Sequence, residues 1–314
     1  MKKIILSITP NPALDLSGIV DAIKPNEKSY VTSEIKAPGG NAINVARILN
    51  RLGANVVATG FLGGHVGKEV ESLLKLESVK SNFIQIQDST RINVTVSNKN
   101  DRQQTRLSFP GPRISKSEIQ KIFKLFETYQ NIKLLTLGGS LPAGFTSQHV
   151  KKLILRAKQK GIHTVIDCPG EILKKIISAQ PLFIKPNLEE FHNLTETHFK
   201  TIPSVEKEAR KLLAQVPFVC VSSVENGTLL VTREGSYFGR IPKMAIKSTV
   251  GAGDSMVAAI MFQISKGNFS GSDLLRWGLA GSAATLSQPG TNLGSKAQIH
   301  KFFRQVKVIK LDRA

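Results

Sequence analysis

The chain has 314 residues, with 43 lysines and arginines against 23 aspartates and glutamates, and a formal net charge of +20. Its length and its 41% hydrophobic residues are those of a folded protein with one large or two smaller domains, which excludes a small stapled scaffold. Only two cysteines occur, Cys168 and Cys220, and neither belongs to a CxxC pattern. Neither a disulfide framework nor a zinc site is therefore predicted, and a reducing cytoplasm is the expected location.

The positive charge could indicate a nucleic-acid binder, which would concentrate it in one stripe with interleaved aromatic residues. Here the basic residues recur throughout, and aromatic residues make up only 6% of the chain. A local run spaced by three drifts off one helix face within about two turns; its members are Lys301, Arg304, Lys307, Lys310 and Arg313. We expect solvated helix faces rather than a nucleic-acid surface. No apolar run reaches the roughly 18 to 20 residues of a spanning helix, so no membrane association is expected.

Apolar patterns alternate between strand and helix for most of the chain. Strands are predicted at 3–9, 56–61, 133–137, 163–167 and 218–222, with helices at 42–52 and 147–160 between them. Short β-branched runs alternating with helices favour a parallel sheet covered on both faces. Beyond residue 254 the pattern turns helical, and helices are predicted at 254–266, 272–286 and 296–307.

Three stretches alternate polar and apolar residues without a following helix: 15–20, 31–36 and 92–108, the last holding two strands around residues 98–101. They predict a small separate sheet, with strands drawn from about 15–36 and 91–109. Because these pieces come from distant parts of the chain, a lid on one domain spanning 1–314 is the preferred interpretation.

The sharpest local feature is Gly251-Ala252-Gly253-Asp254, directly before an apolar helix. Glycines at a helix N-terminus let unpaired backbone N–H groups face a ligand, which makes an anion hole. The simpler interpretation is a turn with Asp254 as the N-cap. The loop is neither a Walker A motif nor a complete dinucleotide fingerprint. A carboxylate beside an anion hole suits phosphoryl transfer, in which a base accepts the proton of the attacking hydroxyl.

A second glycine pair, Gly39 and Gly40, also opens a helix and would allow close contact with a polyol, with Asn44 one turn later. A plain βα turn capped by Asn41 would explain the same residues.

Four segments occur in the order and spacing of the ribokinase-like sugar kinases, the phosphofructokinase-B family: residues 39–47, 138–144, 185–190 and 249–254. This resemblance covers essentially the whole chain. It implies an α/β fold with a mostly parallel central sheet, helices on both faces and a small β-sheet lid. It also implies a homodimer joined through the lids.

Residues 11–15 resemble the branch of the family that acts on phosphorylated hexoses, and residues 248–257 with 281–286 most closely resemble the isozyme 2 type of 6-phosphofructokinase. The resemblance implies ATP-dependent phosphorylation of fructose 6-phosphate at its 1-hydroxyl, giving fructose 1,6-bisphosphate. Tagatose 6-phosphate and fructose 1-phosphate are the alternative substrates. A non-catalytic phosphosugar-binding protein or a nucleic-acid-associated protein is the alternative from another class.

Site residues follow from the resemblance position by position. It implies that Asp254 is the catalytic base, with an anion hole of Gly251, Ala252 and Gly253. Contacts with the sugar hydroxyls are implied for Asp15, Gly39, Gly40 and Asn44. Arg91 and Arg106 are implied to grip the phosphate that the sugar carries, assisted by Lys28 and Ser140. A guanidinium fork suits phosphate, although each arginine alone could be a solvated strand residue.

The resemblance further implies that Asn187 and Glu190 organise Mg²⁺ through water, one helical turn apart. ATP contacts are implied for Lys185, Asn187, Ser222, Gly227, Thr249, Gly281 and Ala284. Three departures weaken parts of this set: Val224 or Glu225 replaces a family glycine near ATP, Asn41 replaces another glycine, and the loop 288–292 is longer than in the isozyme 2 type. The longer loop leaves a requirement for K⁺ open.

Overall fold

The computed structural model describes residues 3–24, 26–100 and 103–312. Its large sheet has the strand order β14-β13-β12-β11-β10-β9-β8-β1-β4-β5. The strands are β1 (Ile4–Thr9), β4 (Val56–Gly63), β5 (Ile84–Ile86), β8 (Ile132–Gly138), β9 (His163–Asp167), β10 (Phe183–Ile184), β11 (Phe218–Val224), β12 (Gly227–Thr232), β13 (Ser236–Arg240) and β14 (Lys307–Leu311). From β5 to β11 neighbouring strands are parallel, whereas β11 to β14 pair antiparallel. The predicted mostly parallel sheet is confirmed.

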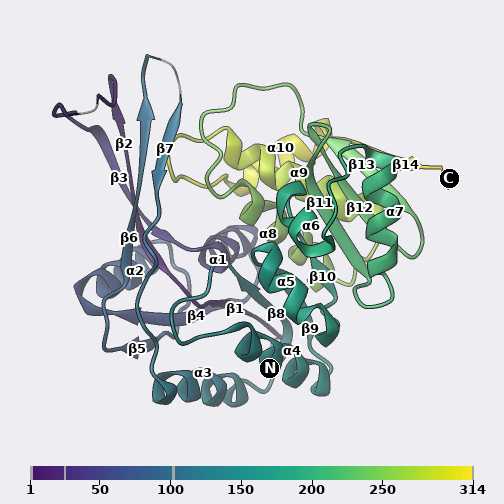
Figure 1. Cartoon of the computed structure of the whole chain (residues 1–314), viewed down its shortest axis with the longest axis horizontal. Helices are drawn as coiled ribbons and strands as arrows, with labels where there is room; N and C mark the ends of the chain where they lie inside the picture. The colour runs from purple at the N-terminus through teal and green to yellow at the C-terminus, as the bar shows by residue number, and fades with distance from the viewer. Residues whose placement is uncertain (1–2, 25, 101–102, 313–314) are drawn as a thin grey trace.

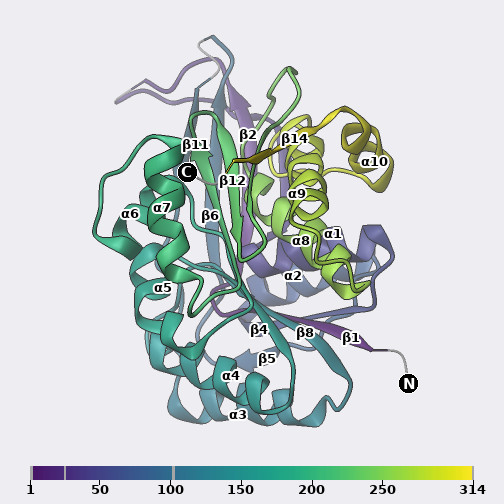
Figure 2. The ribbon, with the colours of Figure 1, turned by 90° about the vertical axis from the view of Figure 1, so that its right-hand side faces the viewer.

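Helices cover both faces of this sheet, as Figure 2 shows. One layer holds α1 (Asn41–Leu52), α2 (Gly64–Leu76), α8 (Ala252–Ser265), α9 (Gly271–Leu286) and α10 (Lys296–Gln305). The other holds α3 (Lys116–Thr128), α4 (Ser147–Gln159), α5 (Gly170–Ile176), α6 (Leu188–Thr195) and α7 (Ile202–Leu212). Neighbouring strand residues serve opposite layers: Leu134 packs in the core of the first layer and Leu135 in that of the second.

Four strands form a second sheet, in the order β3-β2-β6-β7, which we call the lid sheet. They are β2 (Ala13–Val20), β3 (Thr32–Gly39), β6 (Arg91–Asn98) and β7 (Gln104–Leu107). The parallel pair of β2 and β6 joins the two excursions of the chain and sets Asp15 opposite Asn93. In Figure 1 this sheet rises from the large sheet on the side away from α7. The separate small sheet predicted from the sequence is therefore present.

The end of the chain differs from the predicted helix over 296–307. Helix α10 stops at Gln305, and Lys307 begins strand β14, which pairs antiparallel with β13. The basic run is thus divided: Lys301 and Arg304 lie on α10, Lys307 and Lys310 on β14, and Arg313 lies outside the described residues. Among the described residues, none of the helices has the length and apolar composition needed to cross a bilayer.

Candidate active site

Polar side chains follow the carboxyl ends of four neighbouring parallel strands. Asn11 follows β1, Ser140 follows β8, Asp167 ends β9 and Lys185 follows β10. Ligands of open α/β sheets bind at this edge. A cavity of about 410 Å³ lies here beneath the lid sheet, and we call it the central cavity. Its lining includes Asp15, Gly40, Asn44, Arg91, Asn93, Arg106, Asp167, Lys185, Asn187, Glu190, Gly251, Gly253 and Asp254.

Asp254 lies in the first turn of α8 and is only 8% exposed. Its Oδ2 accepts a hydrogen bond of 2.8 Å from the Nδ2 of Asn44 on α1. Burial, followed by the charge of Asp167, raises the pKa of Asp254 to about 7, against the opposing effects of Asn44 and Lys185. A carboxyl group with a pKa near neutrality is suited to exchange protons with a substrate hydroxyl.

The loop before α8 is the predicted anion hole, and its glycines line the central cavity. Gly251 has a φ of 74°, a conformation that favours glycine, and no described side chain caps the helix. The first N–H groups of the helix therefore have no described side-chain acceptor at the end that borders the central cavity. A Cβ at Gly253 would lie 3.3 Å from the Nζ of Lys185, so the glycine lets the ammonium group approach this turn.

Asp15 and the glycine pair form the opposite wall. The Oδ1 of Asp15 accepts a hydrogen bond of 2.9 Å from Asn93, and burial raises the pKa of Asp15. A Cβ at Gly39 would lie 2.2 Å from the Oδ2 of Asp15, so only glycine fits beside this carboxylate. Gly40 has a φ of 115° and lines the cavity.

The two lid arginines contact different neighbours. Arg91 donates to the carbonyl oxygens of Phe109 (2.6 Å) and Asn11 (3.0 Å), and its Nη2 lies 3.5 Å from the Oγ of Ser140. Arg106 donates to the Oγ1 of Thr249 (2.7 Å), beside the anion-hole loop. Burial lowers the pKa of both groups, since nearby carboxylates compensate only partly. They line one cavity, but they are directed to different parts of it.

A chain of charged groups lies along the base of the cavity. Lys185, 6% exposed, forms an ion pair of 3.2 Å with Asp167. Asn187 and Glu190 cap α6 reciprocally, with two hydrogen bonds of 2.8 Å between the backbone of each and the side chain of the other. Burial and the charge of Asp167 raise the pKa of Glu190. The two residues therefore form the N-terminal cap of α6.

The predicted ATP contacts are only partly brought together. Ser222 and Gly227 line a neighbouring cavity of about 570 Å³ that also reaches Gly253, and Asn187 and Lys185 line the central cavity. Gly281 and Ala284 instead lie in helix packing: a Cβ at Gly281 would meet the carbonyl oxygen of Ser255 at 2.4 Å, and Ala284 is fully buried. Thr249 is exposed and holds Arg106.

Two further predicted sugar contacts lie apart from the central cavity. Ser140 accepts a hydrogen bond of 3.1 Å from Asn11 and lines an adjacent cavity that shares Arg91 and Glu190 with the central one. Lys28 is exposed in the loop between β2 and β3, and it lines none of the cavities described here.

Three side chains of the site were absent from the predicted set. Asp167, Asn93 and Asn11 contact Lys185, Asp15 and Ser140 respectively. An acidic residue at the end of a predicted parallel strand was a usable signal for Asp167. The partners of Asn93 and Asn11 depend on lid pairing and strand order, which the sequence alone does not specify.

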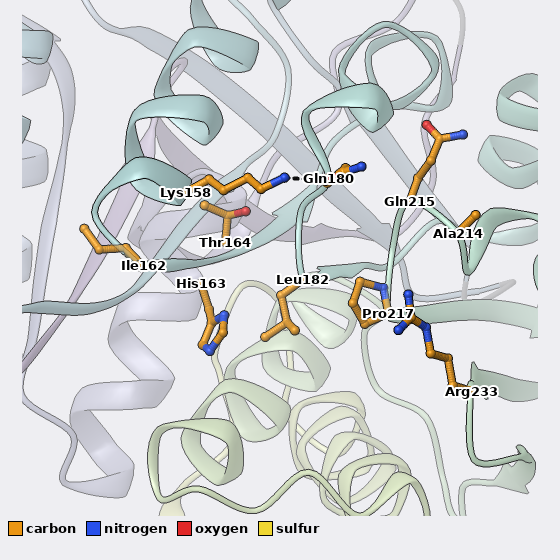
Figure 3. A pocket seen from close by; sticks show the side chains of 11 residues that line it. Lys158, Ile162, His163, Thr164, Gln180, Leu182, Ala214, Gln215, Pro217 and Arg233 are labelled. Carbon is orange, nitrogen blue, oxygen red and sulfur yellow. Dashed lines mark hydrogen bonds between the residues drawn. The ribbon is translucent and has the colours of Figure 1, made fainter.

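Another cavity, of about 340 Å³, lies at the opposite edge of the sheet, beside the amino ends of β9 and β10 (Figure 3). Lys158, His163 and Arg233 line it together with apolar groups such as Leu182. None of the described residues in its lining carries a carboxylate. Its titratable and charged lining groups are one imidazole and two cations, whereas four carboxylates line the central cavity.

The parallel sheet, its lid and the buried carboxylate at a helix N-terminus define the class of the protein as an α/β sugar kinase, an ATP-dependent phosphotransferase. Residues 11–298 match the family described as pfkB family carbohydrate kinase, and the chain belongs to that family. More narrowly, it is a sugar kinase of the phosphofructokinase type.

Its relatives cover nearly its whole length. The chain is 30% identical to the 1-phosphofructokinase of Bacillus subtilis over 309 residues, which span 98% of this chain and 100% of the relative. Phosphofructokinase-2 from Escherichia coli in complex with potassium superposes with a TM-score of 0.90 at 30% identity, covering 97% and 99% of the two chains. The same enzyme in complex with fructose-6-phosphate gives a TM-score of 0.90 at 28% identity, with the same coverage.

Proposed function

We propose that the protein transfers the γ-phosphoryl group of ATP to a primary hydroxyl of a fructose monophosphate, with Asp254 as the base. One observation carries this proposal: a carboxyl group with its pKa raised to about 7 shares the central cavity with the N-terminus of α8. Asp254 accepts the proton as the hydroxyl oxygen bonds to the γ-phosphorus. The bond from that phosphorus to the bridging oxygen breaks, and ADP leaves. The N–H groups at Gly251, Ala252 and Gly253 stabilise the charge on the transferred group.

In this proposal the sugar lies between the lid sheet and α8. Asp15 accepts hydrogen bonds from its hydroxyls, and the absence of side chains at Gly39 and Gly40 allows close approach. Arg91 and Ser140 hold the phosphate that the sugar already carries, since they lie together. Arg106, beside Thr249, neutralises the transferred phosphoryl group. The two arginines thus serve two phosphates rather than the single one predicted from the sequence.

The residues present fit a magnesium ion held through water, because no group of three His, Cys, Asp or Glu side chains among the described residues could hold a metal ion directly. Four carboxylates and three cations line the central cavity, and burial near Asp167 raises the pKa of Glu190, which a nearby cation would relieve. Asn187 and Glu190 would hold Mg²⁺ through water, and Lys185 would contact the phosphates of ATP. When bound, the ion supplies positive charge to the phosphates. Potassium, present in the E. coli complex, stays a prediction, tested by comparing kcat in potassium and tetramethylammonium salts.

Fructose 1-phosphate, phosphorylated at its 6-hydroxyl, is placed first among the substrates. The name of the B. subtilis relative supports it and reverses the order predicted from the sequence. Fructose 6-phosphate is the second candidate, favoured by the E. coli enzyme solved with that sugar. Both reactions yield fructose 1,6-bisphosphate, and both need one phosphate subsite and one hydroxyl beside Asp254.

Steady-state kinetics with fructose 1-phosphate, fructose 6-phosphate and tagatose 6-phosphate test the substrate. The highest kcat/KM is expected for fructose 1-phosphate, and a higher value for either other sugar would reject this order. Asp254→Asn is expected to lower kcat by about 10²- to 10⁴-fold while calorimetry shows nearly unchanged sugar binding. Wild-type kcat in that variant would exclude Asp254 as the base.

A homodimer joined through the lid sheets is part of the proposal. Large apolar side chains of the lid strands and their loops are exposed: Ile19, Ile23, Tyr30, Val31, Leu107 and Phe109. Such a cluster is typical of an interaction surface. One E. coli phosphofructokinase-2 structure is described as a tetrameric inhibited form. Light scattering should give twice the chain mass for the wild type and the single mass for Val31→Asp; a monomeric wild type would contradict the dimer.

A further inference from the structure

A buried guanidinium group lies behind the central cavity. Arg47 on α1 is 3% exposed and is absent from the cavity lining. Its Nε and Nη2 donate to the Oε1 of Glu77, at 2.9 and 2.5 Å. Its Nη1 donates to the carbonyl oxygen of Pro38 (3.2 Å) and to the Oδ1 of Asn44 (3.0 Å). Every nitrogen of this side chain is therefore committed to protein acceptors, and none is directed at a ligand.

These contacts determine how the amide of Asn44 is oriented. The oxygen and nitrogen of an amide are nearly the same size, so its orientation follows from its partners. A guanidinium group only donates, so the atom of Asn44 that faces Arg47 must be Oδ1. The Nδ2 then faces the Oδ2 of Asp254, 2.8 Å away, as a donor. Turned over, the amide would set two donors against each other at Arg47 and two acceptors against each other at Asp254.

Glu77 fixes Arg47 in turn. It caps the end of α2 and pairs with Arg47 through Oε1 and with Arg51 through Oε2. Asn50 donates to its backbone carbonyl at 3.1 Å, which anchors α2 to α1. Although burial alone would raise it, the two arginines hold the pKa of Glu77 below its usual value, so the carboxylate stays charged. Glu77 and Arg47 therefore remain an ion pair at neutral pH.

We infer that the Glu77–Arg47 pair is a positioning element for the reaction: it fixes the amide of Asn44 so that Nδ2 always faces the catalytic carboxylate of Asp254. Through the carbonyl of Pro38 the same guanidinium also holds the turn that begins at Gly39. Neither Glu77 nor Arg47 touches the substrate. This inference rests on the proposed function, because it assumes that Asp254 is the base.

The pH dependence of the reaction reports this role. The charged groups that act on Asp254 are Asp15 from β2, Arg106 from β7, Asp167 from β9 and Lys185 after β10, and Asn44 is its neutral donor. Without Arg47 the amide is free to turn, and the ionised carboxylate loses that donor. The protonated form is then favoured, so more of the enzyme is inactive at a given pH.

Arg47→Met tests the inference in kinetics measured across the acid limb of the pH profile, the range in which the rate falls as the pH is lowered. We expect kcat to fall roughly tenfold at neutral pH, much less on the alkaline side, and KM for the sugar to change little. Arg47→Lys, which keeps a donor and the charge, should recover part of the loss. Arg210→Met is the matched control, since it breaks a helix ion pair with Glu206 away from the cavity. A loss that is equal at every pH, or no loss, would overturn the inference.

The charge of Arg47 itself could also act on Asp254, and a double variant separates the two effects. In an Asn44→Ala background, Arg47→Met should shift the acid limb no further if it acts through the amide. A shift as large as in the wild-type background would refute this route.

Should Arg47→Met fold poorly, Glu77→Gln, which keeps the side-chain volume, replaces it. Its kcat is expected to be lowered at neutral pH and to approach the wild-type value on the alkaline side. A wild type without an acid limb would reject the proposed base, and the inference with it; a normal wild-type limb with unshifted variants would reject the inference alone.

Discussion

At the scale of single residues, the place of a carboxylate in the fold distinguishes it where burial does not. Asp254 and Asp15 are both aspartates with raised pKa values, yet only Asp254 stands at a helix N-terminus. The glycine loop and the helix that carry Asp254 are contiguous, so the sequence alone makes it a candidate base. Its partner Asn44 lies 210 positions away, and the Arg47–Glu77 pair spans 30, so their contacts could not be predicted from local patterns.

The raised pKa of Asp254 predicts a pH profile. A base works only when deprotonated, and burial raises the pKa of this group to about 7. The value of kcat/KM should therefore fall tenfold per pH unit below about 7 and level off above it. Steady-state rates measured across this pH range provide the test, with the ionisation of the sugar phosphate itself taken into account. A fall in kcat/KM that begins only near the ordinary pKa of an aspartate would contradict this prediction.

The close approach of Gly39 and the carboxylate of Asp15 predicts that a side chain at position 39 would displace Asp15. In Gly39→Ala the new Cβ would lie 2.2 Å from the carboxylate of Asp15 and displace it, so KM for the sugar should rise roughly tenfold, the effect of one lost hydrogen bond to a charged group. The control is the same change in an Asp15→Ala background, where no carboxylate is in the way. Equal effects in both backgrounds would show that the clash is not the cause.

At the scale of elements, α8 and α9 cross where Gly281 stands. A Cβ there would meet the backbone oxygen of Ser255, which cannot move aside. At Gly278, on the same helix, the atoms nearest to an added Cβ belong to the side chains of Ile260 and Met256. Gly281→Ala should therefore destabilise the protein by about 1–3 kcal/mol, against a smaller loss for Gly278→Ala, in urea unfolding. Equal losses would mean that backbone contact is unimportant here.

The longer elements were predictable from their apolar period, and the shorter ones were not. Helix α1 ends at Gly53, with a φ of 89°, as its sequence indicates. Strand β10 has two residues and is fixed by its neighbours β9 and β11, so its own pattern carries little information. Residues 307–311 continue the basic run of α10, yet pairing with β13 makes them a strand.

At the scale of the whole molecule, the charge of +20 does not lie in the site. The central cavity has four carboxylates against three cations, so the excess is carried by the rest of the chain. A positive outer field attracts anionic sugar phosphate and ATP, and salt screens it. We expect kcat/KM to fall as ionic strength rises while kcat stays constant, and duplex DNA to migrate freely at physiological salt in a gel-shift assay. A salt-independent kcat/KM would exclude steering.

The lid sheet also constrains how substrate choice can evolve. Asp15, Arg91 and Arg106 lie on strands of one sheet, and β2 and β6 are joined along eight paired residues. In the proposed function, a substitution that shifts one strand would displace the groups for the sugar hydroxyls and those for the phosphates together. A lineage adopting a new sugar would therefore find few single-step routes through these strands. Variation should instead accumulate in the connecting loops, which can lengthen without changing the register.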